Sequence, residues 1–315
     1  MSIRLLLTLL LIISAPAFVG AYETDQFSNR RQIIRDSTVL MNYEVTQAIA
    51  GIVIEHYGER DEMQIVDGIY YRIGGKHWVD KLERFAMDSS EVERLSTPPH
   101  DSIYSGQPLF ATRVAGLFGV GPTMKINHVL IGTDKLGHFL SQGRKFYRRW
   151  VKLGDESKAA EQSAYTERAL FGQMTTGSYS NADLVANYEG YRFYRSLFED
   201  NVIPGKPAIL AWDKDHWIMQ RPFDFADHVN DYWDEALNIN DYDALLYSYM
   251  KERFLTYCDD YRAEPGLWVV HDEETLKHLY QNLQLRDTSE LRLDVLCRDD
   301  KDAPHRTTVH GKGIK

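Results

Sequence analysis

Apolar residues recur every three or four positions over much of this chain, which is the spacing of one face of an α-helix. The clearest case runs from Asp36 to Tyr57 and is followed by Gly58, a residue type that commonly ends helices. Its apolar band consists of Val39, Leu40, Tyr43, Val45, Ile49, Ile52 and Val53. We therefore predict a long amphipathic helix in this segment.

The same spacing predicts further helices over most of the chain, namely Lys76–Met87, Arg113–Phe118, Asp134–Leu153, Glu156–Met174, Ala182–Glu199, Phe225–Leu237, Tyr242–Tyr261 and Glu273–Leu283. A tight β-hairpin is predicted at Met124–Ile131, turning at Asn127 and His128. The expected fold is mainly α: a bundle-like globular protein with a minor β-hairpin.

The first residues have the layout of a secretory signal peptide. Met1 to Arg4 carries a positive charge, and Leu5 to Ile13 is a short apolar run. The small residues Val19-Gly20-Ala21 fit a cleavage site that would make Tyr22 the first mature residue, and Ala15-Pro16-Ala17 is a second candidate site. The run is shorter than the roughly 20 residues of a membrane-spanning helix. An uncleaved N-terminal anchor is the alternative to a periplasmic or secreted protein.

No linker or repeat divides the rest of the chain, and the segment from Pro204 to Pro222 is the best candidate for a seam. The expected organisation is a signal peptide at 1–21, a helical domain carrying the polar site at 22–203, a C-terminal helical lobe packed on it at 204–297, and a disordered tail at 298–315.

The net charge of -10 argues against nucleic acid or an anionic membrane surface as the main partner, and no later apolar run is long enough to span a membrane. The chain is rich in aromatic residues, with 19 Tyr, 13 Phe and 6 Trp. Core packing explains them better than a carbohydrate-binding surface does. The acidic and aromatic stretch from Asp224 to Glu235 is either a solvated loop or a ligand-contacting rim.

Two cysteines occur, Cys258 and Cys297. In an oxidising compartment an isolated pair is most simply one disulfide, while two buried free thiols are the alternative.

Polar residues gather on three consecutive predicted helices. Asp134, Lys135 and His138 lie on the first, with Gln142 on the same face; Glu167 lies on the second, and Asp183 and Asn187 on the third. Residues three or four positions apart share a helical face. Three such faces turned together would form a compact acid–base or metal site, in which we expect His138 to contact Glu167 or Asp183.

Several of these residues also have a purely structural interpretation. Thr133 could cap the first helix, and Asp134 would then favour its dipole. Ser180 could cap the third helix, with Asp183 completing a capping box. Gly190 would allow another helix to approach closely.

The pattern Asp-Lys-x-x-His, then Glu, then Ser-x-x-Asp-x-x-x-Asn-x-x-Gly resembles the VanZ-like families of bacterial envelope proteins, which include periplasmic and lipoprotein-like relatives of unknown function. The matching residues are Asp134, Lys135, His138, Glu167, Ser180, Asp183, Asn187 and Gly190. VanZ-like proteins are integral membrane proteins, whereas this segment is too polar to span a bilayer. The resemblance implies a shared site on envelope proteins and does not name an activity.

Such a site supports two kinds of chemistry. Without a metal, His138 is the general acid or base, Glu167 or Asp183 orients it, and Lys135 or Asn187 stabilises an oxyanion. With a metal, His138, Glu167 and Asp183 bind a divalent ion that carries an activated water. The absence of a second histidine favours the version without a cofactor. Ser180 and Gln142 complete the set of binding residues.

Two hypotheses follow. The first is an envelope enzyme, a hydrolase or transferase that acts on lipid or cell-wall material. The second is a non-catalytic envelope protein in which the same residues form a structural hydrogen-bond network. A site that reaches solvent at His138 favours the first, and a closed, fully paired network favours the second.

Overall fold

The computed structural model describes residues 23–75, 79–107, 119–168 and 177–298. The predicted signal peptide, the helix predicted at 113–118 and nearly all of the predicted tail lie outside these residues. Helices dominate the described part, and its sheets have two or three strands each. None of its helices combines the length and apolar character needed to cross a membrane.

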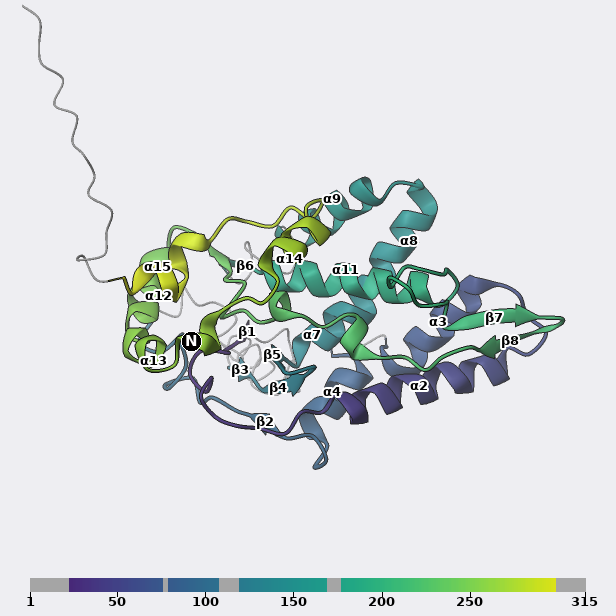
Figure 1. Cartoon of the computed structure of the whole chain (residues 1–315), viewed down its shortest axis with the longest axis horizontal. Helices are drawn as coiled ribbons and strands as arrows, with labels where there is room; N and C mark the ends of the chain where they lie inside the picture. Colours follow the sequence, from purple (N-terminus) through teal and green to yellow (C-terminus); the bar gives the residue numbers. More distant parts are fainter. Residues whose placement is uncertain (1–22, 76–78, 108–118, 169–176, 299–315) are drawn as a thin grey trace, which may run out of the picture.

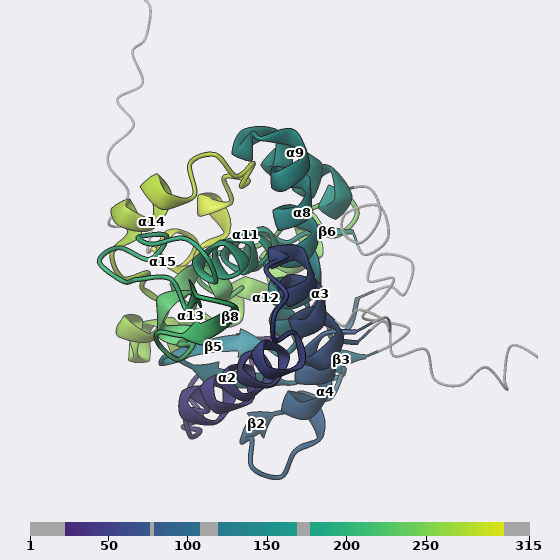
Figure 2. The same ribbon diagram turned by 90° about the vertical axis from the view of Figure 1, so that its right-hand side faces the viewer.

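Helix α11 (Asn181–Ser196) runs through the middle of the molecule (Figures 1 and 2). Only Arg192 and Arg195 among its 16 residues are not buried. On one side it packs against α7 (Asp134–Gly137), the π-helix η1 (His138–Gln142), α8 (Gly143–Leu153) and α9 (Glu156–Thr166). These elements bring the predicted polar residues to α11.

The first long helix is α2 (Thr38–Glu55), which is followed by Gly58 with a positive φ of 82°. This confirms the prediction for Asp36–Tyr57, but the apolar band lies partly on the wrong face. Val39 is 84% exposed and Tyr43 58% exposed, while Met41 and Ala48 are buried. Helix α2 is apolar on both faces, so spacing alone could not select the inner one. Helices α3 (Glu62–Ile73) and α4 (Lys81–Asp88) follow it.

The predicted hairpin is confirmed as β4 (Thr123–Ile126) and β5 (Val129–Gly132), with Asn127 and His128 at positive φ in the turn. Strand β2 (Arg94–Leu95) pairs with β4 to complete a three-stranded antiparallel sheet. The other strands form two-stranded ladders. Strand β1 (Glu23–Thr24) pairs in parallel with β3 (Val120–Gly121), and β6 (Ser178–Tyr179) pairs antiparallel with β9 (Asp241–Tyr242). A hairpin that was not predicted joins β7 (Leu210–Asp213) and β8 (His216–Met219).

The helix predicted at Phe225–Leu237 is wrong. The segment contains two short 3₁₀ turns, η3 (Phe225–Asp227) and η4 (Asp231–Trp233). Three side chains accept hydrogen bonds from nearby backbone N–H groups: Asp224 from Ala226, Asn230 from Tyr232, and Asp234 from Ala236. Local bonds of this type compete with continuous helix, and here they divide the segment.

The helix predicted at Tyr242–Tyr261 is divided as well. It consists of α12 (Tyr247–Leu255) and α13 (Cys258–Ala263). The hydroxyl of Thr256 donates to the carbonyl of Arg253 at the break between them. The C-terminal part continues with η5 (Pro265–Trp268), α14 (Glu273–Leu279), η6 (Ser289–Leu291) and α15 (Leu293–Leu296).

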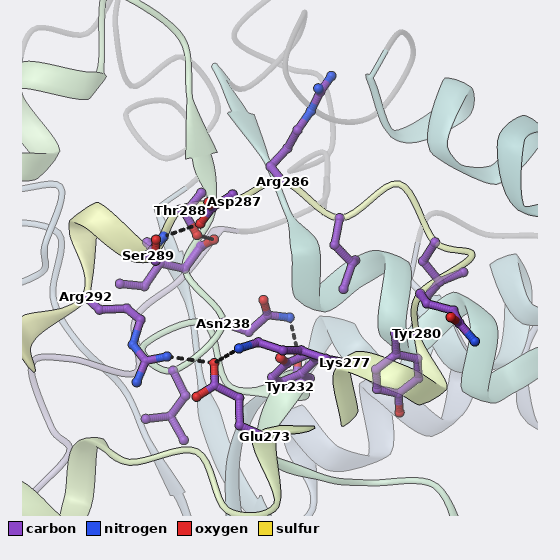
Figure 3. Close-up of a pocket in the computed structure, with 15 residues that line it drawn as sticks. Tyr232, Asn238, Glu273, Lys277, Tyr280, Arg286, Asp287, Thr288, Ser289 and Arg292 are labelled. Carbon is purple, nitrogen blue, oxygen red and sulfur yellow. Dashed lines mark hydrogen bonds and ion pairs between the residues drawn. The ribbon is translucent and has the colours of Figure 1, made fainter. Parts of the chain in front are cut away.

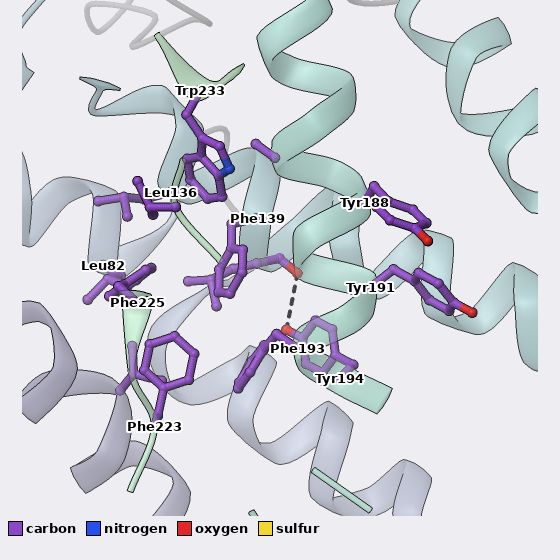
Figure 4. Packing of buried hydrophobic residues seen from close by; sticks show 14 of the residues in the cluster. Leu82, Leu136, Phe139, Tyr188, Tyr191, Phe193, Tyr194, Phe223, Phe225 and Trp233 are labelled. Carbon is purple, nitrogen blue, oxygen red and sulfur yellow. Dashed lines mark hydrogen bonds between the residues drawn. The ribbon is translucent and has the colours of Figure 1, made fainter. Parts of the chain in front are cut away.

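Aromatic residues fill the core, as the composition indicated. Around Phe139 lie the rings of Phe193, Phe225 and Trp233, at centroid distances of 5.3, 5.5 and 5.7 Å (Figure 4). This cluster combines residues from both sides of the predicted seam, and the division into two domains stays a prediction.

A second apolar cluster surrounds the stacked rings of Phe27 and Phe254. Cys258 and Cys297 lie in it and form a disulfide, which confirms the predicted pairing.

Candidate functional site

Lys135 lies at the centre of a group of charged side chains beside α11. Its side chain is 1% exposed, and its Nζ lies 2.7 Å from Asp134 Oδ2, 2.7 Å from Asp183 Oδ1 and 2.8 Å from Glu235 Oε1. The ammonium group donates hydrogen bonds to Asp134 and Glu235 and forms an ion pair with Asp183. Burial by itself would lower the pKa of Lys135, but the three carboxylates outweigh it and raise the pKa. Lys135 is therefore a buried counter-ion shared by three carboxylates.

The helix that carries Lys135 begins at Asp134, as predicted, with Thr133 at the N-cap position. The side chain of Thr133 does not make the predicted capping bond, because Thr133 itself has helical dihedral angles. The helix then widens into the π-helix η1, which begins at His138. Such segments are rare and frequently occur at functional sites.

The first turn of α11 supplies the facing residues. The hydroxyl of Ser180 accepts a hydrogen bond from the backbone N–H of Asp183 at 3.1 Å, which confirms the predicted cap. The same hydroxyl donates to Glu235 Oε1 at 3.0 Å. The carboxylate of Asp183 contacts Lys135 and His138. Ser180 thus fixes both the helix start and a carboxylate of the charged group.

His138 is held at both ring nitrogens. Its Nε2 lies 3.2 Å from Asp183 Oδ2, and its Nδ1 lies 3.0 Å from Asn187 Oδ1. The amide of Asn187 in turn donates to Ser163 Oγ at 3.4 Å. The predicted contact between His138 and a carboxylate of the third helix is therefore confirmed. Asn187 orients the ring and fixes which edge of it faces Asp183.

Glu167 follows α9 and completes the contact between the three helices. Burial raises its pKa well above the usual value, and the charge of the hydrogen-bonded Asp183 raises it further. For Asp183, burial would raise the pKa, but His138 and Lys135 lower it. Glu167 therefore holds its proton and donates it in a hydrogen bond to an ionised Asp183. Two adjacent carboxyl groups with opposite shifts are a common arrangement in acid–base sites.

Glu235 belongs to this group and was not predicted. It lies in the irregular segment after η4, contacts Lys135 and Ser180, and has a pKa raised by burial. Its only signal in the sequence was the run of acidic and aromatic residues from Asp224 onward.

Two more buried acids, Asp80 and Glu83 of the α4 N-terminus, were also missed. The hydroxyl of Ser141 donates to Asp80 at 2.6 Å, while burial raises the pKa of Asp80 to about 6. Burial also raises the pKa of Glu83, and nearby Asp134 adds to the effect. A capping box joins Asp80 and Glu83, so their sequence signal is structural.

Three residues could share a metal ion. Ligand atoms of Asp134, His138 and Asp183 lie within 4.8 Å of one another. This set contains Asp134 in place of the predicted Glu167, which hydrogen-bonds to Asp183 instead. Asp134 Oδ1 is buried and accepts no hydrogen bond from the described residues. Imidazole and carboxylate oxygen suit zinc, manganese or iron.

Gln142 does not join the group. It lies half-buried in η1 and makes no hydrogen bond to the site residues that the structure describes. The π-helical turn holds more residues than an α-turn, so the i, i+4 spacing from His138 no longer places the two side chains on one face.

A second charged network on α11 provides a comparison. Glu189 accepts hydrogen bonds from Tyr280 at 2.8 Å and Arg192 at 2.8 Å, and it lies 3.0 Å from His228 Nδ1. The side chains of Glu189 and His228 are 0% and 1% exposed. Burial lowers the pKa of His228, which keeps its ring neutral.

The two networks differ in access to solvent. In the first, the side chains of His138, Asp183 and Asp134 are 16%, 12% and 13% exposed, above the buried Lys135. In the second, both the histidine and its carboxylate are closed off. One helix therefore carries a histidine–carboxylate pair that reaches the surface and another that does not.

Comparisons with protein-family models, with curated proteins and with solved structures give no match. The function of the site is therefore inferred from its own geometry.

Proposed function

We propose that this protein is an exported enzyme of the bacterial envelope, a hydrolase or transferase acting on lipid or cell-wall material, with an acid–base centre formed by His138 and Asp183. The observation that carries the proposal is the partly exposed pair of His138 Nε2 and Asp183 Oδ2, 3.2 Å apart, above an otherwise buried charged group. The VanZ-like motif and the signal-peptide pattern support the envelope location.

The roles follow from the contacts. A substrate oxygen at the exposed edge would meet His138 and Asp183 together, and His138 would give or take the proton. Asn187 holds the imidazole ring in position through its Nδ1 atom. Glu167, whose pKa is raised, hydrogen-bonds to Asp183 and can transfer a proton to it. Lys135 holds Asp134, Asp183 and Glu235 in place, and its charge, together with that of His138, lowers the pKa of Asp183.

The matched variants His138→Ala and His228→Ala test the proposal, since each removes one histidine from a carboxylate of α11. The purified mature protein and both variants are incubated with phospholipid vesicles and with peptidoglycan, and products are identified by mass spectrometry. We expect His138→Ala to abolish turnover with little change in melting temperature. His228→Ala should lower the melting temperature, because it leaves Glu189 without one of its buried partners.

The alternative is a structural network that happens to reach the surface. The complete pairing of Lys135 favours it. In that case His138→Ala costs about 1–3 kcal/mol of folding free energy and no substrate is turned over.

A divalent metal is the second candidate for the chemistry of this site, and the trio Asp134, His138 and Asp183 favours it. Two ligands that bind one ion at about 2.1 Å lie roughly 3.0–3.4 Å apart, which fits the 3.2 Å between His138 and Asp183. Metal content of the mature protein and melting curves with Zn²⁺, Mn²⁺ or EDTA, repeated on Asp134→Asn, decide between the two versions.

A further inference from the structure

A cavity lies beside α14 (Figure 3). Its volume of about 480 Å³ lies within the roughly 300–1,000 Å³ usual for small-molecule sites. Its walls come from α14, the segment after it, and the stretch from Leu237 to Ile239.

The cavity has an apolar and aromatic floor. The rings of Tyr232 and Tyr280 lie nearly parallel, with centroids 5.8 Å apart. Leu237, Ile239 and Leu283 are buried beside them. Because Tyr232 and Tyr280 are 7% and 1% exposed, these side chains close the bottom of the cavity, and a ligand is recognised mainly by the groups at its rim.

The ionic groups at the rim are paired with one another. Glu273 Oε1 lies 2.9 Å from Arg292 and 3.2 Å from Lys277, and Arg292 also lies 2.9 Å from Asp294 (Figure 3). Of the other charged residues that line the cavity, Arg286 lies 3.8 Å from Asp241, and Asp287 accepts a hydrogen bond from the backbone N–H of Ser289. Each charged group at the rim thus has a partner, so the cavity does not require an ionic ligand.

The rim offers hydrogen-bond acceptors as well as donors. Both cations reach Glu273 through the same oxygen, Oε1. The amide of Asn238 donates to the carbonyl of Tyr232 at 2.9 Å, which leaves its carbonyl oxygen as an acceptor. Carboxylate, amide and guanidinium groups in one rim match a ligand with many hydroxyl groups, each of which both donates and accepts.

The cavity and the charged group around Lys135 are formed in part by the same two segments of the chain. Glu235 binds Lys135, and two residues further on Leu237 lines the cavity. At the start of α11, the N-cap residue Ser180 donates to Glu235, while the next residue, Asn181, donates to the carbonyls of Ile239 and Arg286 at 3.0 Å each. Both carbonyls belong to residues that line the cavity.

We propose that this cavity binds an uncharged sugar unit, with its hydroxyl groups at Asn238 and Glu273. The cavity binds the sugar whether or not His138 is catalytic.

Titration calorimetry on the mature protein tests this with three probes: the uncharged trimer of N-acetylglucosamine, the anionic N-acetylmuramic acid, and glycerol. The variants Asn238→Ala and Glu273→Gln change the rim without emptying the floor. Arg84→Ala is the control, because Arg84 lines a different hollow beside α4.

We expect binding of the uncharged trimer, at least tenfold weaker binding in Asn238→Ala and Glu273→Gln, and no change in Arg84→Ala. Melting curves show whether either rim variant fails to fold. If one does, the binding measured with the other rim variant tests the proposal. Unchanged binding in His138→Ala separates this site from the proposed acid–base centre. The proposal is overturned if the trimer does not bind, if the anionic sugar or glycerol binds as well or better, or if the rim variants bind like the wild type.

Discussion

Gly143 and Gly190 face each other where α8 crosses α11. A Cβ atom on Gly143 would lie 2.5 Å from the Cα of Gly190. A Cβ on Gly190 would collide with the carbonyl of Phe139 and lie 2.9 Å from the Cα of Gly143. The close helix approach predicted at Gly190 is therefore confirmed, and it brings η1 with His138 against α11.

Gly190→Ala should destabilise the protein by about 1–3 kcal/mol or more, because the new methyl group meets backbone atoms that cannot move aside. Gly266→Ala is the control, since nothing lies within 4 Å of a Cβ at that position. Urea unfolding of both variants measures the difference. Equal stability of the two variants would show that α8 and α11 can separate without cost.

Lys135→Met should be among the most damaging single substitutions. It leaves Asp134, Asp183 and Glu235 buried without their cation, a change that typically costs about 3–5 kcal/mol. Lys158→Met is the matched control, because Lys158 is 67% exposed and its pair with Asp155 is on the surface. Thermal melts at neutral pH compare them, and a Lys135→Met protein as stable as the control would contradict a buried counter-ion.

Asp80 should make folding stability depend on pH between its ordinary pKa of 3.8 and its raised pKa of about 6. The folded protein holds this proton more tightly than the unfolded chain, so the contribution of Asp80 is full below pH 3.8 and is lost as the pH rises through 6. Asp80→Asn, which stays neutral, should therefore gain stability relative to wild type across this window. Urea melts from pH 4 to 7 measure the gain.

Ser141→Ala provides the companion variant. The hydroxyl of Ser141 lowers the pKa of Asp80, so its removal should move the window above pH 6. Parallel stability curves for wild type and Asp80→Asn would contradict a raised pKa at Asp80.

The disulfide between Cys258 and Cys297 should stabilise the C-terminal cluster around Phe254. We expect the double variant Cys258→Ser, Cys297→Ser to lose about 2–4 kcal/mol, since the crosslink closes a loop in the unfolded chain. Guanidinium melts measure the loss, and mass spectrometry of the unreduced wild type should show two hydrogens fewer than the free thiols. Two thiols that alkylate in the native wild-type protein would rule the bond out in solution.

The sequence was sufficient for those parts of the site that lie on regular helices. His138 and Asp183 could be paired because α-helical spacing holds from Asp134 to His138, before η1 widens, and because Asp183 lies in the first turn of α11. The hairpin with Asn127 and His128 at its turn could also be predicted, because a hairpin depends on residues that are close together in the sequence.

Residues in irregular segments could not be placed in this way. Glu235 reaches Lys135 from 100 positions away, through turns that Asn230 and Asp234 create by bonding to the backbone. Asp80 has a local role as a helix cap, which conceals its contact with Ser141. Such contacts depend on tertiary packing, and neither periodicity nor composition encodes it.

The burial of α11 has a consequence for how the molecule opens. A helix enclosed on nearly all sides exposes its amide hydrogens only when its neighbours separate from it. The exchange of those hydrogens with solvent should thus be among the slowest in the described part of the chain, at a rate set by global unfolding. Asp183 and Glu189 both lie on this helix. The pair of His138 with Asp183 and the pair of His228 with Glu189 would therefore break in the same unfolding event.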